Sequence, residues 1–272
     1  MHRVLIIDDD PIALNMMNLV IENLGYKTQC FSEPQKALDW LTQNDCSLVL
    51  TDYEMPHISG IEVLKAVKEQ HQNIPVVIIT AYSNLNLIRE ALVSGAFDFV
   101  EKPLNPKYVN EVFRLATTFN NVPTNYLPAI RNITPQHKDK AQDETTSNIL
   151  NYYFLSDLVK AIGYEKLNSA ILEFIQITDI SMEKLIHSPQ NLQTQLSFLH
   201  RLIGTAASLG LTQLEQHCHA MQQEFKNSDS PIPDQNIQAI KETYMLSCQR
   251  LKKYLSEVTT PSQDHSFQKI DN

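Results

Sequence analysis

The sequence predicts two domains of different fold class. Residues 1–118 are expected to form a doubly wound α/β domain with a five-stranded parallel sheet, and residues 148–257 an all-α helical bundle. In the first part, short apolar runs alternate with helix-length segments, as in buried parallel strands joined by crossover helices. In the second part, helical periodicity recurs without a convincing strand pattern. The stretch between them, 119–147, contains three prolines and a polar run, which is typical of a linker.

The α/β domain is expected to repeat a strand and a helix along its length. Residues at helix ends support this reading: Pro11 suits a first helical turn, Gly25 can end the helix that follows, and Ser59 with Gly60 can open another. The apolar runs place strands near 3–7, 27–31, 47–51, 75–80 and 97–101.

The helical domain is expected to be broken at glycine and proline residues. Treated as a flexible coil of about 29 residues, the linker would span roughly 30 Å, which lets the two domains meet. Residues 258–272 are predicted to be a polar, frayed tail. Helical periodicity recurs near 150–162, 165–187, 191–209, 212–226 and 233–256.

Composition argues against several classes of protein. The net charge is −9 and no basic stripe is visible, so nucleic acid is not an expected partner. No apolar stretch approaches the length of a membrane span and the first residues lack a secretory pattern, so we expect no membrane insertion and a cytoplasmic location. The cysteines show no CxxC pair and are expected to be reduced thiols rather than disulfides or zinc ligands: Cys30, Cys46, Cys218 and Cys248.

Polar residues stand at four places where a predicted strand ends. They are the pair Asp8–Asp9, then Asp52, Thr80 and Lys102. Because ligands of an open α/β sheet bind beyond the carboxyl ends of its strands, we expect these side chains to converge at one edge. The next residue, Asp10, is interpreted as an ordinary helix N-cap.

Such a pocket suits a divalent metal ion and a phosphoryl group. Mg²⁺ prefers oxygen ligands, and Asp9 and Asp52 could supply carboxylates. A carboxylate oxygen can also act as a nucleophile and form an aspartyl phosphate. Lys102 and Thr80 would then bind the remaining phosphoryl oxygens, since phosphoryl transfer asks a protein mainly for positioning and electrostatic stabilisation.

With these motifs, residues 2–118 resemble the receiver domain of a two-component response regulator, a flavodoxin-like fold. The resemblance implies that Asp52 is the phosphoacceptor and that Asp9 is the chief metal-binding acid, assisted by Asp8. The residues that carry the resemblance are Asp8–Asp9, the run Asp52-Tyr53-Glu54-Met55-Pro56, Thr80-Ala81 and Lys102-Pro103.

The same resemblance implies further details of the pocket. The main-chain carbonyl of Glu54 would contact the Mg²⁺ ion together with Asp8, Asp9 and Asp52, and a cis peptide would precede Pro103. Phe99 falls at the family's switch-aromatic position, three residues before the lysine. In the family, the residue that matches Thr80 moves toward the phosphoryl group while that aromatic turns inward.

One histidine in the helical half has unusual neighbours. His200 lies at the border of a predicted apolar stripe, and Gly204, Ala207 and Ser208 follow one and two turns later. A glycine inside a helix costs about 1 kcal/mol relative to alanine, so it usually has a packing or docking reason. Here small side chains would clear space around an exposed imidazole.

This pattern resembles the histidine-phosphotransfer domain over roughly 148–257, most sharply over 200–221. His200 is then the phosphorylatable histidine, whereas His217 and His219 are expected to be ordinary surface or cap groups. One departure is that Ile203 stands where the family usually has a lysine. Transfer through His200 would then be slow, or would use a cation from elsewhere.

The favoured interpretation is a phosphorelay protein, a phosphotransfer signalling protein rather than a turnover enzyme. Asp52 and His200 would carry phosphoryl groups, in a direction that the sequence does not encode. The implied partners are a sensor histidine kinase, another receiver or another histidine-phosphotransfer protein; the sequence predicts no oligomeric state.

Two alternatives remain open at this point. One is a binding adaptor that phosphorylation of Asp52 switches without histidine chemistry, for which Ile203 is the best support. The other is a DNA-binding transcriptional regulator with a helix-turn-helix around Gly210. The supposed recognition helix, 211–225, contains acidic residues but no lysine or arginine, which disfavours docking against phosphates.

Overall fold

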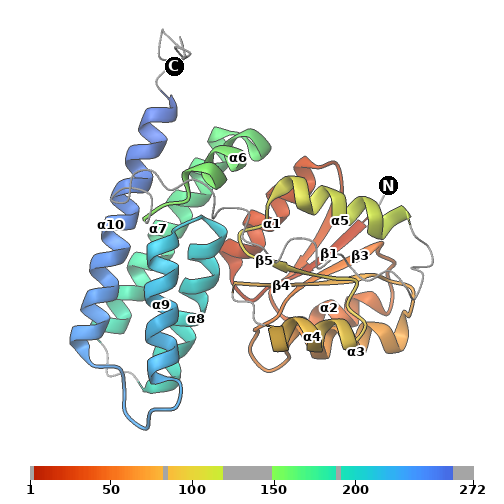
Figure 1. The fold of residues 1–272 in the computed structure, drawn as a ribbon, viewed down its shortest axis with the longest axis horizontal. Helices are drawn as coiled ribbons and strands as arrows, with labels where there is room; N and C mark the ends of the chain where they lie inside the picture. Colours follow the sequence, from red (N-terminus) through yellow and green to blue (C-terminus); the bar gives the residue numbers. More distant parts are fainter. Residues whose placement is uncertain (1–2, 82–84, 119–148, 188–190, 260–272) are drawn as a thin grey trace, which may run out of the picture.

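The structure is a computed structural model that describes residues 3–81, 85–118, 149–187 and 191–259. The predicted linker 119–147 and most of the predicted tail therefore lie outside the described residues. Two bodies make up the described chain: an α/β domain and a helical bundle that lies against it (Figure 1).

The α/β domain is built on five parallel strands in the order β2-β1-β3-β4-β5. Each strand lies within one residue of its predicted run, which confirms the predicted fold class. The order reverses between β1 and β3, so the carboxyl ends of these strands flank the crevice where such sheets bind ligands. The strands are β1 Arg3–Ile7, β2 Lys27–Phe31, β3 Leu48–Asp52, β4 Val76–Thr80 and β5 Asp98–Glu101.

Helices cover both faces of this sheet. One face packs against α1 and α5, and the other against α2, α3 and α4 (Figure 1). Because side chains alternate along a strand, Val4 and Ile6 face the first pair, whereas Leu5 and Ile7 face the second group. The helices are α1 Pro11–Asn23, α2 Pro34–Leu41, α3 Gly60–Gln70, α4 Leu85–Val93 and α5 Pro106–Thr118.

Helix caps place the ends of the helices near the crevice. Asp10 is the N-cap of α1, as predicted, because its side chain accepts a hydrogen bond from the amide of Ile12 at 2.9 Å. Ser59 and Glu62 form a capping box at the start of α3. Both helices therefore begin at defined residues directly beside the ends of β1 and β3.

The bundle consists of long helices separated at the predicted breaks. Gly210, between α8 and α9, has a positive φ of 66°, and a Cβ atom there would lie 2.9 Å from Cδ1 of Phe154. The last helix continues to Thr259, two residues into the predicted tail. The helices are α6 Tyr152–Ile162, α7 Tyr164–His187, α8 Leu192–Ser208, α9 Thr212–Phe225 and α10 Asp234–Thr259.

The two domains share one apolar core across α1. Ile12, Met16 and Val20, each 3% exposed, belong to the same buried cluster as the core residues of the bundle. Burying a side chain of this kind contributes about 1.5–3 kcal/mol to stability. For docking of the bundle this is an upper estimate, because the α/β domain by itself already covers part of the surface of these side chains. The sequence did not predict this shared core.

The structure also bears on the cysteines and on membrane-spanning helices. All four cysteines are free thiols, as predicted, with Cys218 and Cys248 buried and the other two partly buried. Within the described ranges, no helix combines the length and apolarity needed to cross a bilayer.

Candidate functional site

Asp52 ends the fully buried strand β3 and is itself only 6% exposed. The chain after it is anchored on both sides: the amide of Tyr53 donates to the Ile79 carbonyl at 2.7 Å, and the Gly60 amide donates to the Tyr53 carbonyl at 2.8 Å. These main-chain bonds fix the Asp52 carboxylate at the mouth of the crevice.

Gly60 allows α3 to start directly against the main chain of Asp52. A Cβ atom at position 60 would collide with the Asp52 carbonyl oxygen. We therefore expect Gly60→Ala to lower the free energy of unfolding by about 1–3 kcal/mol, because overpacking forces the backbone to shift. Urea denaturation measures the change, and Gly95→Ala, where a Cβ meets nothing within 4 Å but φ is +92°, separates steric overlap from backbone strain. A loss below about 0.5 kcal/mol in Gly60→Ala would contradict the overlap.

Lys102 bridges the acidic residues that converge here. Its ammonium nitrogen lies 2.7 Å from Oδ2 of Asp8 and 3.2 Å from Oδ1 of Asp52, and the lysine is only 4% exposed. The Lys102 amide also donates to the Thr80 carbonyl at 2.7 Å, and the peptide before Pro103 is cis, as the resemblance implied. The predicted convergence of the strand-end residues is therefore confirmed.

The carboxylates of this cluster are crowded and poorly hydrated. Burial, opposed by the charge of Lys102, raises the pKa of Asp52 to about 7, and burial together with Asp8 also raises the pKa of Asp9. Burial alone would lower the pKa of Lys102. The charges of Asp52 and Asp8 outweigh the effect of burial, and the pKa of Lys102 is raised. One ammonium thus faces several carboxylates, and a further cation would stabilise their charged forms.

The two proposed switch residues occupy different parts of the domain. Thr80 ends β4, is 4% exposed, and lines the same cavity as Asp52 and Lys102. Phe99 pairs with Ile78 in the sheet and packs, partly buried, on the side of α2, α3 and α4.

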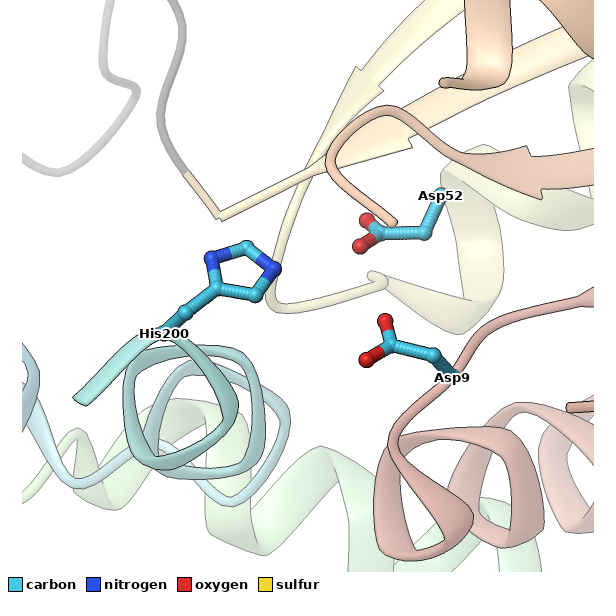
Figure 2. A group of neighbouring side chains, drawn as sticks. All are labelled: Asp9, Asp52 and His200. Carbon is cyan, nitrogen blue, oxygen red and sulfur yellow. The ribbon is translucent and has the colours of Figure 1, made fainter. Parts of the chain in front are cut away.

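His200 projects from α8 toward the acidic pocket of the α/β domain (Figure 2). One of its ring nitrogens lies within 4.8 Å of carboxylate oxygens of both Asp9 and Asp52. Nε2 lies 2.8 Å from the main-chain oxygen of Glu54, and Nδ1 lies 3.1 Å from Oε2 of the same residue. The imidazole that was expected to be exposed is thus only 25% exposed and sits against the chain's own α/β domain.

The contact with Glu54 changes the acidity of both partners. Burial alone would lower the pKa of His200. The hydrogen bond and the charge of Glu54 outweigh the effect of burial and raise this pKa to about 9. The hydrogen bond from His200 in turn lowers the pKa of Glu54.

Ile203, at the position of the family's usual lysine, lies next to a residue that faces a cation of the α/β domain. Ile203 is 4% exposed and belongs to the bundle core, although it also lines the cavity between the domains, and the next residue, Gly204, faces the α/β domain. A Cβ atom on Gly204 would lie 3.7 Å from the ammonium nitrogen of Lys102. A cation from the other domain therefore approaches the surface that carries His200.

A second polar contact across the domains was missed by the sequence analysis. The Thr205 hydroxyl donates a hydrogen bond to Oδ2 of Asp10, and both residues are buried. Burial, with Asp8, raises the pKa of Asp10 to about 6, so this residue is more than an ordinary solvated cap. No local pattern marks the pair, because its members are 195 positions apart.

Replacing Thr205 with valine should loosen the docking of the two domains. A hydrogen bond to a charged group contributes about 1.5–3 kcal/mol, so the docked population should fall relative to the undocked one by about tenfold or more. Amide hydrogen exchange of α1 measures the change, because its bundle-facing residues lose protection on undocking. The matched control is Thr243→Val, whose hydroxyl bonds within the bundle. Unchanged exchange in α1 would refute a docking role for Thr205.

Glu215, at the start of α9, gives the structure a pH dependence. Burial, with the nearby charge of Glu101, raises its pKa from 4.5 to about 7. The folded state then holds this proton more tightly than the unfolded state. The contribution of protonated Glu215 to the free energy of unfolding is therefore fully present below about pH 4.5 and is lost as the pH rises through about 7. Relative to wild type, Glu215→Gln should gain roughly 1–3 kcal/mol of unfolding free energy at pH 8 compared with pH 5. Denaturation curves of wild type and Glu215→Gln at pH 5 and pH 8 measure this gain. The same difference in unfolding free energy between the two proteins at both pH values would contradict it.

A cavity of about 920 Å³ lies between the domains and includes the pocket. The α/β domain contributes Asp52, Thr80 and Lys102, and α8 contributes His200. One face of α9 adds His219, Gln222 and Gln223, and Lys226 follows at the C-cap of the same helix. His219, expected to be an ordinary surface group, therefore lines the same cavity as His200.

Two family models match separate parts of the chain. Residues 4–114 match the family model of the "Response regulator receiver domain", and residues 165–260 match that of the "Hpt domain". The chain therefore contains a receiver domain and an Hpt domain. The Hpt match includes the stretch that was considered as a helix-turn-helix.

Curated relatives match less than half of this chain. The chain is 35% identical over 101 residues to "Transcriptional regulatory protein FixJ" of Bradyrhizobium diazoefficiens, covering 37% of this chain and 49% of that protein. It is 32% identical over 115 residues to "Regulatory protein AtoC" of Escherichia coli, covering 42% and 25%. The chain thus spans half or less of the length of these relatives. A solved receiver domain from Clostridium thermocellum is 26% identical, with a TM-score of 0.42 over 43% of this chain and 95% of that one.

Proposed function

We propose that Asp52 accepts a phosphoryl group, that His200 carries one, and that the two residues exchange it within a single chain. The observation that carries this proposal is the position of a His200 ring nitrogen within 4.8 Å of a carboxylate oxygen of Asp52. A gap of this order suits in-line transfer of one phosphoryl group between the two side chains, so docking supplies the orientation that a bimolecular encounter would have to find.

Each step has a role for residues of the pocket. A carboxylate oxygen of Asp52 forms a bond to phosphorus as the bond from phosphorus to the donor's leaving group breaks. In the exchange, a nitrogen of His200 forms the bond to phosphorus and the bond to the Asp52 oxygen breaks, which restores the carboxylate. Lys102 and Thr80 bind the oxygens of the group in transit, and electrostatic stabilisation of this kind is the main catalytic requirement.

The donor set of the pocket fits Mg²⁺. Asp8, Asp9 and Asp52 offer carboxylate oxygens and Glu54 offers a main-chain oxygen, which are the hard ligands this ion prefers. The raised pKa values of Asp9 and Asp52 support the same conclusion, because crowded carboxylates favour an additional cation. When bound, the ion would offset the repulsion between the carboxylates and an incoming phosphoryl group.

The partners that this chemistry implies are other members of a phosphorelay. A sensor histidine kinase or another Hpt protein would exchange the group with Asp52, and another receiver would exchange it with His200. The chain then acts as a phosphotransfer protein that changes state, rather than as a turnover enzyme. The competing adaptor role, in which His200 does no chemistry, is supported only by the missing lysine at Ile203, and Lys102 of the receiver approaches the same surface.

Labelling of the wild-type chain tests this proposal. With a small phosphodonor and Mg²⁺, label should appear in a base-labile form on Asp52 and in an acid-labile form on His200. Because exchange within one chain is unimolecular, its rate constant should not change over a hundredfold dilution of the protein. Absence of both kinds of label would overturn the assignments, and a rate proportional to protein concentration would overturn exchange within the chain.

A further inference from the structure

Glu54 engages both ring nitrogens of His200, and this contact has no place in the transfer step. Its main-chain oxygen lies 2.8 Å from Nε2 and its carboxylate lies 3.1 Å from Nδ1. A carbonyl oxygen only accepts hydrogen bonds, so Nε2 donates to it. A ring nitrogen that carries this proton has no lone pair with which to attack phosphorus, so the contact orients His200 but keeps Nε2 from reacting until the contact is broken.

The main-chain oxygen of Glu54 also belongs to the donor set proposed for Mg²⁺. We propose that Glu54 is a positioning residue for His200, and that the docked imidazole and a divalent metal ion compete for this oxygen. The inference rests on the metal-binding part of the proposed function, but it does not depend on transfer between Asp52 and His200.

Geometry makes joint occupancy unfavourable. Mg²⁺ binds oxygen ligands at about 2.0–2.1 Å and demands near-ideal octahedral positions. The imidazole already has one nitrogen 2.8 Å from the Glu54 oxygen and one within 4.8 Å of the Asp9 and Asp52 carboxylates. It therefore stands next to the oxygens that would hold the ion, and its Nε2–H group already uses the Glu54 oxygen as a hydrogen-bond acceptor. Binding of the ion should displace Nε2 from Glu54.

The Glu54 main chain cannot readily move to serve both groups. The residue before it is held by hydrogen bonds to Ile79 and Gly60, which anchor the loop on the sheet and on α3. The Glu54 side chain is more adaptable, because it is 52% exposed. The carboxylate can thus retain Nδ1 while the carbonyl changes partner, which would keep His200 near the pocket and free its other nitrogen.

The test is the affinity of the full-length, unphosphorylated chain for Mg²⁺, measured by titration calorimetry. If docking of His200 competes with the ion, His200→Ala should bind Mg²⁺ about tenfold more tightly than wild type, which corresponds to loss of one or two competing hydrogen bonds. His71→Ala, at the far end of α3, is the matched control and should bind as wild type does.

A double-mutant cycle separates the hold of Glu54 on His200 from its direct electrostatic effect on the metal. Glu54→Ala leaves the main-chain oxygen in place and removes the carboxylate. The ratio of Mg²⁺ affinities between His200→Ala and its parent should shrink from about tenfold to about threefold or less when Glu54 is alanine, because the imidazole is then held by one contact. An unchanged ratio would mean that the carboxylate does not position His200.

A second readout follows the imidazole directly. In wild type, Mg²⁺ should shift the ring-nitrogen NMR signals of His200 and leave those of His71 unchanged. Equal Mg²⁺ affinity in wild type and His200→Ala, with no shift of His200, would overturn the competition. The outcome differs if only the proposed function fails: Mg²⁺ and His200 would still compete, but the chain would take no label. Normal labelling without competition would contradict this inference and leave the proposed function intact.

Discussion

Asp52→Asn is expected to abolish labelling by a small phosphodonor, at both the base-labile and the acid-labile position. The amide has the shape of the carboxylate but lacks its nucleophilic oxygen, so no acyl phosphate forms. Label on His200 that passes through the receiver should vanish with it. We expect less than about 1% of the wild-type label, measured by acid and base stability of the labelled chain.

The substitution also alters charge, which needs a control. Asp45→Asn makes the same change at an exposed residue outside the pocket and should label normally. Because Lys102 pairs with Asp8 as well as Asp52, the ammonium keeps one partner in Asp52→Asn and the domain should stay folded. Base-labile label on a folded Asp52→Asn protein would move the acceptor role to Asp8 or Asp9.

The receiver site was predictable because its residues follow strand ends. Each acidic, hydroxyl or ammonium group comes directly after an apolar run, and parallel strands bring their carboxyl ends to one edge. The position of Asp52 in space therefore follows from its position at the end of β3. The same reasoning applies to Lys102 after β5, which lies 3.2 Å from Asp52.

The docking of the two domains could not be read from strand ends, but α1 did contain a signal. This helix is apolar on two sides: Met17 and Ile21 pack toward the sheet, whereas Ile12, Met16 and Val20 pack toward the bundle. The second group follows helical spacing of four residues. A helix that covers one face of a sheet needs only one such stripe, so the second stripe indicates another packing partner.

The polar contacts between the domains had no comparable signal. Thr205 and Asp10 pair across 195 positions, and Glu54 meets His200 across 146. Serine, threonine and glutamate are common on helix and loop surfaces, so only the relative position of the domains shows which of them meet. The resemblance pointed to the carbonyl of Glu54 but said nothing of its side chain.

His200→Gln is expected to remove the acid-labile label while leaving the base-labile label on Asp52. The glutamine amide can still donate a hydrogen bond to the Glu54 carbonyl, so docking should persist, but it has no ring nitrogen able to form a bond to phosphorus. With its acceptor gone, the acyl phosphate on Asp52 loses one route of decay and should persist longer than in wild type.

The control is His71→Gln, which makes the same change away from the pocket and should keep both labels. The result also separates the relay from the adaptor. If His200 carries the phosphoryl group, downstream signalling in cells should collapse in His200→Gln although Asp52 is still phosphorylated, because the group has no onward route. Signalling at the wild-type level with Asp52 labelled would instead favour an adaptor, in which the docked bundle serves only as the binding surface that phosphorylation releases.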